Sequence, residues 1–182
     1  GAQDNIFNVG DPMKLITEGK CADVQIMAGC TAGEFPSVLP AKSREEFEQK
    51  IKEIFGDKAE EFLALPEANV CENDSFYAKV NGIDCTVKGI LGAKKASGDT
   101  KNHYCYKFDA DIPGWDNPGT FHSVDLWFFF ETLAKCWRPF VGRHYDLSRQ
   151  MCNYWANFIK TGDPNGEDAD GTPMPKWEPY TN

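Results

Sequence analysis

The stretch that decides the fold lies near the start of the chain and reads Asp23-Val24-Gln25-Ile26-Met27-Ala28-Gly29-Cys30. This run is nearly continuous in apolar residues and ends at the turn-prone stretch Thr31-Ala32-Gly33-Glu34. A short apolar run of this kind is typical of a strand that is buried in a parallel sheet. We therefore predict a strand over residues 23–30, with a loop at its C-terminal end.

A second strand is predicted from His103 to Phe108, where aromatic residues alternate before a loop rich in proline and glycine, residues 109–121. His122 stands where that loop ends. Strands that alternate with helices favour an α/β fold with a parallel sheet. Because only two convincing strands are present, we expect an incomplete parallel sheet flanked by helices and completed by residues outside this sequence.

Apolar residues at helical spacing predict the helices between and after these strands. The first has the capping box Ser43-Arg44-Glu45-Glu46 before Phe47, Ile51, Ile54 and Phe55, and a shorter one follows from Asp57 towards Pro66. The next is capped by Asp74 and contains Phe76, Val80, Ile83, Val87 and Leu91. The last two are one from Ser123 with Leu126, Phe129, Phe130 and Leu133, and a long one after Asp146 with Leu147, Met151, Tyr154, Trp155 and Phe158. We find no internal repeat and no linker, so residues 1–182 are predicted to belong to one domain.

Composition limits the partners that are expected. The chain has 182 residues, of which 41% are apolar, which is enough for a sizeable core. Its net charge of -9 repels phosphate backbones and anionic lipid headgroups, so we expect no nucleic-acid and no membrane partner. No apolar run approaches the roughly 20 residues that span a bilayer.

Seven widely spaced cysteines form no C-x-x-C pair and no zinc-site spacing. We predict mostly reduced, buried thiols and a cytoplasmic location, with one or two disulfides in a secreted form as the alternative. The oxygen-rich stretch of residues 163–171 lacks the glycine and the terminal glutamate of an EF-hand. No metal and no cofactor are therefore expected.

Two residues suited to catalysis follow the predicted strands. Open α/β sheets place reactive side chains on loops beyond the C-terminal ends of their strands, and both Glu34 and His122 fit that position. The order of an acid before a histidine matches the last two members of an α/β-hydrolase triad, whose serine comes first on a G-x-S-x-G turn. The chain has six serines, and none has glycine two residues away on both sides.

Four segments of the chain resemble the type-B carboxylesterases, which are related to cholinesterases. Residues 119–130, which contain His122, resemble the G-x-x-H segment of the catalytic histidine. Residues 22–35 resemble the strand that leads to the catalytic glutamate, although Gly33 and Phe35 stand where the family has the Asp and Gly of D-E-G. Residues 151–165, with their G-D-P-N exit, and residues 177–180 resemble the last long helix and the segment after it.

The resemblance implies the C-terminal part of an α/β-hydrolase fold, in which His122 is the general base and Glu34 orients it. Asp125, three residues after His122, would add a second negative charge. The nucleophilic serine would come from the N-terminal portion of the esterase, the substrate would be a small apolar ester, and this chain alone would be inactive. The alternative is a non-catalytic interaction module, as in the cholinesterase-like adhesion proteins, or a decayed gene fragment.

Several aromatic and histidine residues are assigned no catalytic role. Core packing is expected for most of residues 127–130, with an acyl pocket as the alternative. His103 and His144 are expected at the surface or in an interface. An incomplete sheet should expose apolar surface and a strand edge, so self-association is also expected when the chain is isolated.

Overall fold

The computed structural model describes residues 6, 9–34, 41–72, 75–78 and 82–181. The chain divides into two compact units. The larger unit consists of Gly1–Ala32 together with Ile83–Asn182, and the smaller one of Gly33–Gly82. Each unit has its own hydrophobic core. Among the described residues, no helix is long and apolar enough to cross a membrane.

The larger unit is organised around two parallel strands, β1 (Met27–Thr31) and β4 (Tyr104–Phe108). Their register aligns Met27 with Tyr104 and Thr31 with Phe108. Both predicted strands and their parallel pairing are confirmed, although β1 begins later than residue 23. The later start of β1 reflects a long-range contact, because the backbone N–H of Ile26 donates to Nδ1 of the His103 side chain at 3.1 Å.

A glycine allows β1 and β4 to lie close together. Gly29 lies opposite Tyr106 in the register, and a Cβ atom at position 29 would overlap the carbonyl oxygen and the ring of Tyr106. Only glycine fits such a close approach without displacing the backbone. The glycine in the run from Asp23 to Cys30 therefore has a packing role in the sheet.

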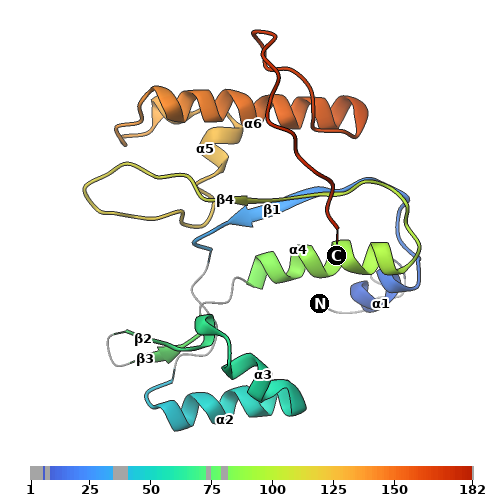
Figure 1. The fold of residues 1–182 in the computed structure, drawn as a ribbon, viewed down its shortest axis with the longest axis vertical. Coiled ribbons are helices and arrows are strands. Elements are labelled where there is room, and N and C mark those ends of the chain that lie inside the picture. Colours follow the sequence, from blue (N-terminus) through green and yellow to red (C-terminus); the bar gives the residue numbers. More distant parts are fainter. Residues whose placement is uncertain (1–5, 7–8, 35–40, 73–74, 79–81, 182) are drawn as a thin grey trace. The chain divides into compact units, whose positions relative to one another are not determined.

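Helices lie on both sides of this strand pair, with α4 on one side and α5 and α6 on the other (Figure 1). The helices of the larger unit are α1 (Pro12–Thr17), α4 (Gly82–Ala96), α5 (Leu126–Phe129) and α6 (Gly142–Thr161), with a short 3-10 turn at Leu133–Lys135. Their core joins the end of β4 to α5 and α6 through Phe108, Ile112, Val124, Phe128, Leu133 and Met151. This arrangement is the predicted α/β fold with helices flanking a parallel sheet.

The helix predicted to begin at Ser123 is reduced to the single turn of α5. Leu126 and Phe130, which were expected on its buried face, are 47% and 70% exposed. Glu131 adopts a positive φ of 50°, which a helix cannot continue through. Burial of Phe128 and Leu133 is achieved by this bent path, so the core outweighs the helical spacing of the sequence.

The last helix is confirmed but begins earlier than predicted, at Gly142 and not after Asp146. His144 supports this earlier start, because its Nδ1 accepts a hydrogen bond from the backbone N–H of Val141 at 2.9 Å. The helix ends at Gly162, whose φ of 78° is left-handed and suited to glycine.

The smaller unit contains α2 (Arg44–Phe55), α3 (Ala59–Leu63), β2 (Val70–Glu72) and β3 (Ser75–Tyr77), with 3-10 turns at Gly56–Lys58 and Pro66–Ala68. The predicted N-cap at Ser43 is confirmed, whereas the return bond of the capping box, from the Glu46 side chain, goes to the residue before the cap. Ser43 Oγ accepts from the Glu46 N–H at 3.2 Å, and Glu46 Oε2 accepts from the Lys42 N–H at 3.0 Å. Phe47 and Ile51 are fully buried.

The helix predicted to begin at Asp74 is wrong in its first half. Phe76 belongs to β3, which pairs with β2 in an antiparallel hairpin, and α4 begins only at Gly82. Phe76 also exchanges backbone hydrogen bonds with Ala41, both at 2.9 Å. Ala41 is distant from Phe76 in the sequence, and helical spacing alone reveals neither this contact nor the hairpin. Asp74 and Val80 lie outside the described residues.

Candidate functional site

The loop between β4 and α5 carries His122. This side chain is exposed, whereas Val124, two residues later, is fully buried in the core of the larger unit. Ser123 between them has a positive φ of 68°, and the Val124 N–H donates to the Phe121 carbonyl at 3.1 Å. A non-glycine residue in this conformation is uncommon and often marks a functional turn. The imidazole is therefore presented to solvent from a tightly turned and anchored backbone.

Arg138 also holds the loop that carries His122. Its guanidinium binds the two carboxylate oxygens of Asp116 in a bidentate pair, each at 2.9 Å, and donates to the Pro113 carbonyl at 3.1 Å. The same guanidinium lies over the ring of Phe121, 5.5 Å from its centre. Arg138 is largely buried, since only 9% of its surface is exposed. The residue before His122 is thus fixed by a cation that also fixes the middle of the loop.

The electrostatics of this clamp follow from its geometry. The hydrogen bond from Arg138 lowers the pKa of Asp116, and that same bond raises the pKa of Arg138. Both shifts favour the ionised forms of the pair. Sequence reasoning missed both residues, because they lie 22 positions apart and no local pattern connects them.

The start of the loop is tied to α6. Arg143 forms an ion pair with Asp111 at 3.0 Å, and Nε2 of His144 lies 3.0 Å from the Asp111 carbonyl oxygen. His144 is buried, since only 3% of it is exposed. The expectation of a surface or interface position for His144 is therefore wrong: both of its ring nitrogens have backbone partners inside the unit.

His103 is likewise buried and not a surface residue. It has no exposed surface, its Nδ1 accepts from the Ile26 N–H, and its Nε2 lies 3.2 Å from Oδ2 of Asp99. Burial lowers the pKa of His103 although Asp99 acts in the opposite direction. With both nitrogens engaged inside the protein, neither His103 nor His144 is suited to take a proton from a substrate-binding group. Of the three histidines in the sequence, His122 is the exposed one.

Asp125 lies one turn after His122 and is buried, with 7% of its surface exposed. The hydroxyl of Tyr106, on β4, donates to its Oδ2 at 3.2 Å. A buried carboxylate near the turn of His122 is consistent with the predicted second negative charge. Whether that charge acts on His122 stays a prediction.

Glu34 follows β1 directly, three residues after the strand ends at Thr31. The last hydrogen bond of the strand pair is nearby, from the Ala32 N–H to the Phe108 carbonyl at 2.8 Å. Glu34 belongs to the smaller unit and His122 to the larger one. The pairing of these two side chains stays a prediction.

A cavity of about 630 Å³ lies beside β4 in the larger unit and is lined by Tyr106, Phe108, Phe129, Met151, Trp155 and Trp177, among others. His122 is not among its lining residues. Phe128 is fully buried in the core, as expected, whereas Phe129 lines this cavity and Phe130 is exposed. The aromatic run therefore divides between core, cavity and surface.

The expectations about the thiols and about metal binding can also be compared with the structure. The seven cysteines, all of which lie in the described part of the chain, form no disulfide, but Cys21, Cys71 and Cys85 are exposed, so the expectation of burial is wrong for these three. Across the described part of the chain, no group of three or more His, Cys, Asp or Glu side chains is arranged to hold a metal ion.

Comparison with known proteins gives consistent results. A sequence profile described as the carboxylesterase family matches residues 80–182. The chain is 35% identical to acetylcholinesterase of Gallus gallus over 43% of this chain and 10% of that protein. It is 25% identical to carboxylesterase 4A of Bos taurus over 97% of this chain and 36% of that protein.

Solved structures agree on the fold. A thermophilic PNB esterase superposes with a TM-score of 0.61 at 21% identity, over 95% of this chain and 36% of that one. The chain thus spans about a tenth to a third of the length of these proteins. Its strand pair and flanking helices form part of an α/β-hydrolase fold. Because the family profile covers more than half of the sequence, the chain belongs to the carboxylesterase family.

Proposed function

We propose that this chain supplies the acid and the histidine of a Ser-His-Glu triad in a carboxylic-ester hydrolase, with Glu34 as the acid and His122 as the base. The observation that carries the proposal is the parallel pairing of β1 with β4. Parallel neighbours end at the same edge of a sheet, and the segments that follow these two strands carry a glutamate and a histidine. Membership of the carboxylesterase family supports the order of the two residues.

The proposed chemistry assigns a separate role to each side chain. One ring nitrogen of His122 accepts the proton of the serine hydroxyl as the hydroxyl attacks the ester carbonyl, and later returns it to the leaving alcohol. Glu34 accepts a hydrogen bond from the other ring nitrogen and stabilises the imidazolium. The anchored turn at Ser123 supports this role, because a general base must be held within hydrogen-bond reach of its proton.

The nucleophile is proposed to come from a partner, the N-terminal portion of the esterase, since none of the serines of this sequence stands in a G-x-S-x-G turn. Removal of the serine from a triad costs on the order of 10⁶ in kcat. We therefore propose that this chain alone is inactive. A small apolar ester is the proposed substrate, in keeping with the carboxylesterase family.

The two-stranded sheet also supports the proposal that the isolated chain self-associates. Among the described strands, β1 and β4 have only each other as hydrogen-bonded neighbours. Trp115, Trp137 and Phe130 are 90%, 60% and 70% exposed. Apolar surface and open strand edges promote contact between chains. In isolation the chain should therefore self-associate and bind a hydrophobic dye, and a monodisperse monomer by light scattering without dye binding would contradict this.

The function is tested by hydrolysis of a p-nitrophenyl ester. The chain is assayed alone and together with the N-terminal portion encoded upstream of it, with a serine-to-alanine version of that portion as the matched control. Activity is expected only when both portions are present and the serine is intact. Turnover by this chain alone at ordinary enzyme rates would overturn the roles assigned here. An upstream sequence without a G-x-S-x-G turn would instead favour a non-catalytic interaction module.

A further inference from the structure

Backbone strain is concentrated around His122. Within the described ranges, the non-glycine residues with a positive φ are Asn117, Ser123 and Glu131, at 42°, 68° and 50°. All three lie between β4 and α6, and the first two lie on either side of His122. Such conformations cost free energy and persist only where contacts from the surrounding structure hold them. The segment that presents His122 therefore needs support from outside itself.

Arg138, which lies before α6, contacts this segment at three places. Its guanidinium donates to the Pro113 carbonyl and to both carboxylate oxygens of Asp116. It also lies over the ring of Phe121. One peptide bond separates this last contact from His122, so a shift of the guanidinium also moves the backbone that carries the imidazole.

The loop is shaped for a flat cation at this point. A Cβ atom at position 114 would overlap Nη1 of Arg138 and the carboxylate of Asp116, so glycine is required there. The guanidinium also lies over the ring of Trp137, 4.6 Å from its centre. A guanidinium stacks on rings and binds a carboxylate through two parallel hydrogen bonds, whereas the ammonium of a lysine does not. The site therefore requires arginine and not positive charge alone.

The arrangement of Arg138 is not the one that stability alone would favour. Its Nε is buried and has no hydrogen-bond partner in the part of the chain that the structure describes. A buried donor without an acceptor lowers stability, and native structures largely avoid it. The guanidinium is oriented to bind Pro113 and Asp116 while its own Nε is left unpaired. Features that lower stability in this way are concentrated at functional sites.

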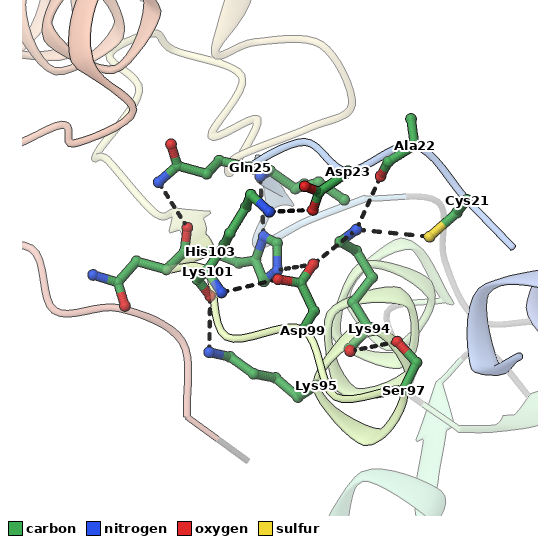
Figure 2. Close-up of polar contacts among 12 residues, drawn as sticks. Cys21, Ala22, Asp23, Gln25, Lys94, Lys95, Ser97, Asp99, Lys101 and His103 are labelled. Atoms are coloured by element: carbon green, nitrogen blue, oxygen red, sulfur yellow. Dashed lines mark hydrogen bonds and ion pairs between the residues drawn. The ribbon is translucent and has the colours of Figure 1, made fainter. Parts of the chain in front are cut away.

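A second buried cation shows the opposite arrangement (Figure 2). Lys94, near the end of α4, lies 3.0 Å from Oδ2 of Asp99. Its Nζ also donates to the Ala22 carbonyl at 3.3 Å and lies 3.7 Å from Sγ of Cys21. The three N–H donors of this ammonium therefore have three acceptors. None of these partners belongs to the loop before His122, so the ion pair of Lys94 supports the fold alone.

We propose that Arg138 is a positioning residue for His122, and that its guanidinium holds the loop so that the imidazole stays where it can accept the serine proton. This role rests on the proposed function, in which His122 is the general base. A general base acts only within hydrogen-bond reach of its proton, and a misplacement of about 1 Å costs on the order of 10²-fold in rate. Because the planar fork of the guanidinium sets the geometry, lysine does not replace it.

The first test uses this chain alone and needs no esterase activity. Amide hydrogen exchange of residues 114–122 is followed by peptide mass spectrometry in an Arg138→Lys variant and in an Asp99→Asn variant, which loses the buried carboxylate partner of Lys94. Exchange in this segment should accelerate on the order of tenfold in Arg138→Lys, and more than exchange in β4 or α6. In Asp99→Asn the segment should accelerate no more than the rest of the unit. A segment that exchanges equally in the unmodified chain and in Arg138→Lys would overturn the proposal.

The second test is the hydrolysis of a p-nitrophenyl ester by the esterase assembled from both portions. In Arg138→Lys, kcat should fall on the order of 10²-fold while KM changes less than about threefold. The matched control is Arg149→Lys, which alters an ion pair with Asp168 outside the loop and should leave both constants unchanged. A rise in KM with an unchanged kcat, or an equal loss in the two variants, would contradict a positioning role.

A third variant separates position from charge. Gly114→Ala keeps every donor of Arg138 but displaces the guanidinium, so it should reproduce the loss of kcat and the faster exchange, also where Arg138→Lys does not fold. Circular dichroism establishes that each variant is folded. An inactive His122→Gln variant beside a fully active Gly114→Ala variant would overturn the role of Arg138 and leave the proposed function intact. If His122→Gln is active, the proposed function fails instead, and the exchange rates alone decide whether Arg138 holds the turn.

Discussion

Two histidines, one before strand β4 and one after it, differ in their burial. His103 precedes the strand, is fully buried and has both ring nitrogens engaged by Ile26 and Asp99. His122 follows the loop after the strand and is exposed on a turn whose neighbours are buried. The same side chain thus stabilises the fold at one end and is available for chemistry at the other. Environment, and not residue type, separates the two roles.

The sharpest test of this comparison is a His122→Gln substitution in the esterase assembled from both portions. The proposed general base is lost, so kcat for a p-nitrophenyl ester should fall by on the order of 10⁴-fold or more. Thermal unfolding of the chain should stay unchanged, because the exposed imidazole contributes little to the core. A variant that retains most of its activity would remove His122 from the mechanism.

Around His103, by contrast, a substitution is expected to change the free energy of unfolding. An Asp99→Asn substitution leaves the buried ammonium of Lys94 without its carboxylate, and it should lower the free energy of unfolding by about 3 kcal/mol. The matched control is Asp111→Asn, which removes an exposed ion pair with Arg143 and should cost less than about 0.5 kcal/mol. Urea denaturation followed by circular dichroism measures both. Similar costs for the two variants would contradict a stabilising role for the buried pair.

The pH dependence of stability should also reveal the buried histidine. Burial lowers the pKa of His103 below 6.5, so the unfolded chain takes up this proton first as the pH falls. The stability is fully present above pH 6.5 and declines below it. Asp99 adds a second decline, because the Lys101 N–H and the Lys94 ammonium lower its pKa from 3.8 to about 2.

Denaturation curves between pH 7.5 and about pH 2 separate the two windows, because the decline from Asp99 falls between pH 3.8 and about pH 2. A His103→Gln variant should lose the decline between pH 6.5 and pH 5 and keep the one at lower pH, and His122→Gln should resemble the unmodified chain. If His103→Gln declines as steeply as the unmodified chain in the upper window, another group titrates there.

The smallest effect is expected at the hydrogen bond between Tyr106 and Asp125. A Tyr106→Phe substitution removes the hydroxyl that donates to Asp125 at 3.2 Å and should lower the free energy of unfolding by about 1 kcal/mol. In the assembled esterase the same change should alter kcat only a few-fold. A loss as large as that of His122→Gln would show that Asp125 is far more important to the base than its position suggests.

Local patterns were sufficient for part of the molecule. Strand β1 follows from an apolar run, α2 from the capping box at Ser43, and α6 from the spacing between Leu147 and Phe158. The segment around His122 was identified from its G-x-x-H pattern. Each of these signals lies within a few residues, because helix caps and strand alternation depend on near neighbours in the sequence.

The sequence by itself therefore determined the two parallel strands, the helices α2 and α6 and the likeness to the carboxylesterase family. Only the tertiary structure decided which histidine is buried, where α5 ends and how Arg138 holds the loop before His122. The contact between His103 and Ile26 joins residues 77 positions apart, and that between Arg138 and Asp116 joins residues 22 apart. Such partners are brought together by packing of the core, and no pattern of neighbouring residues encodes them.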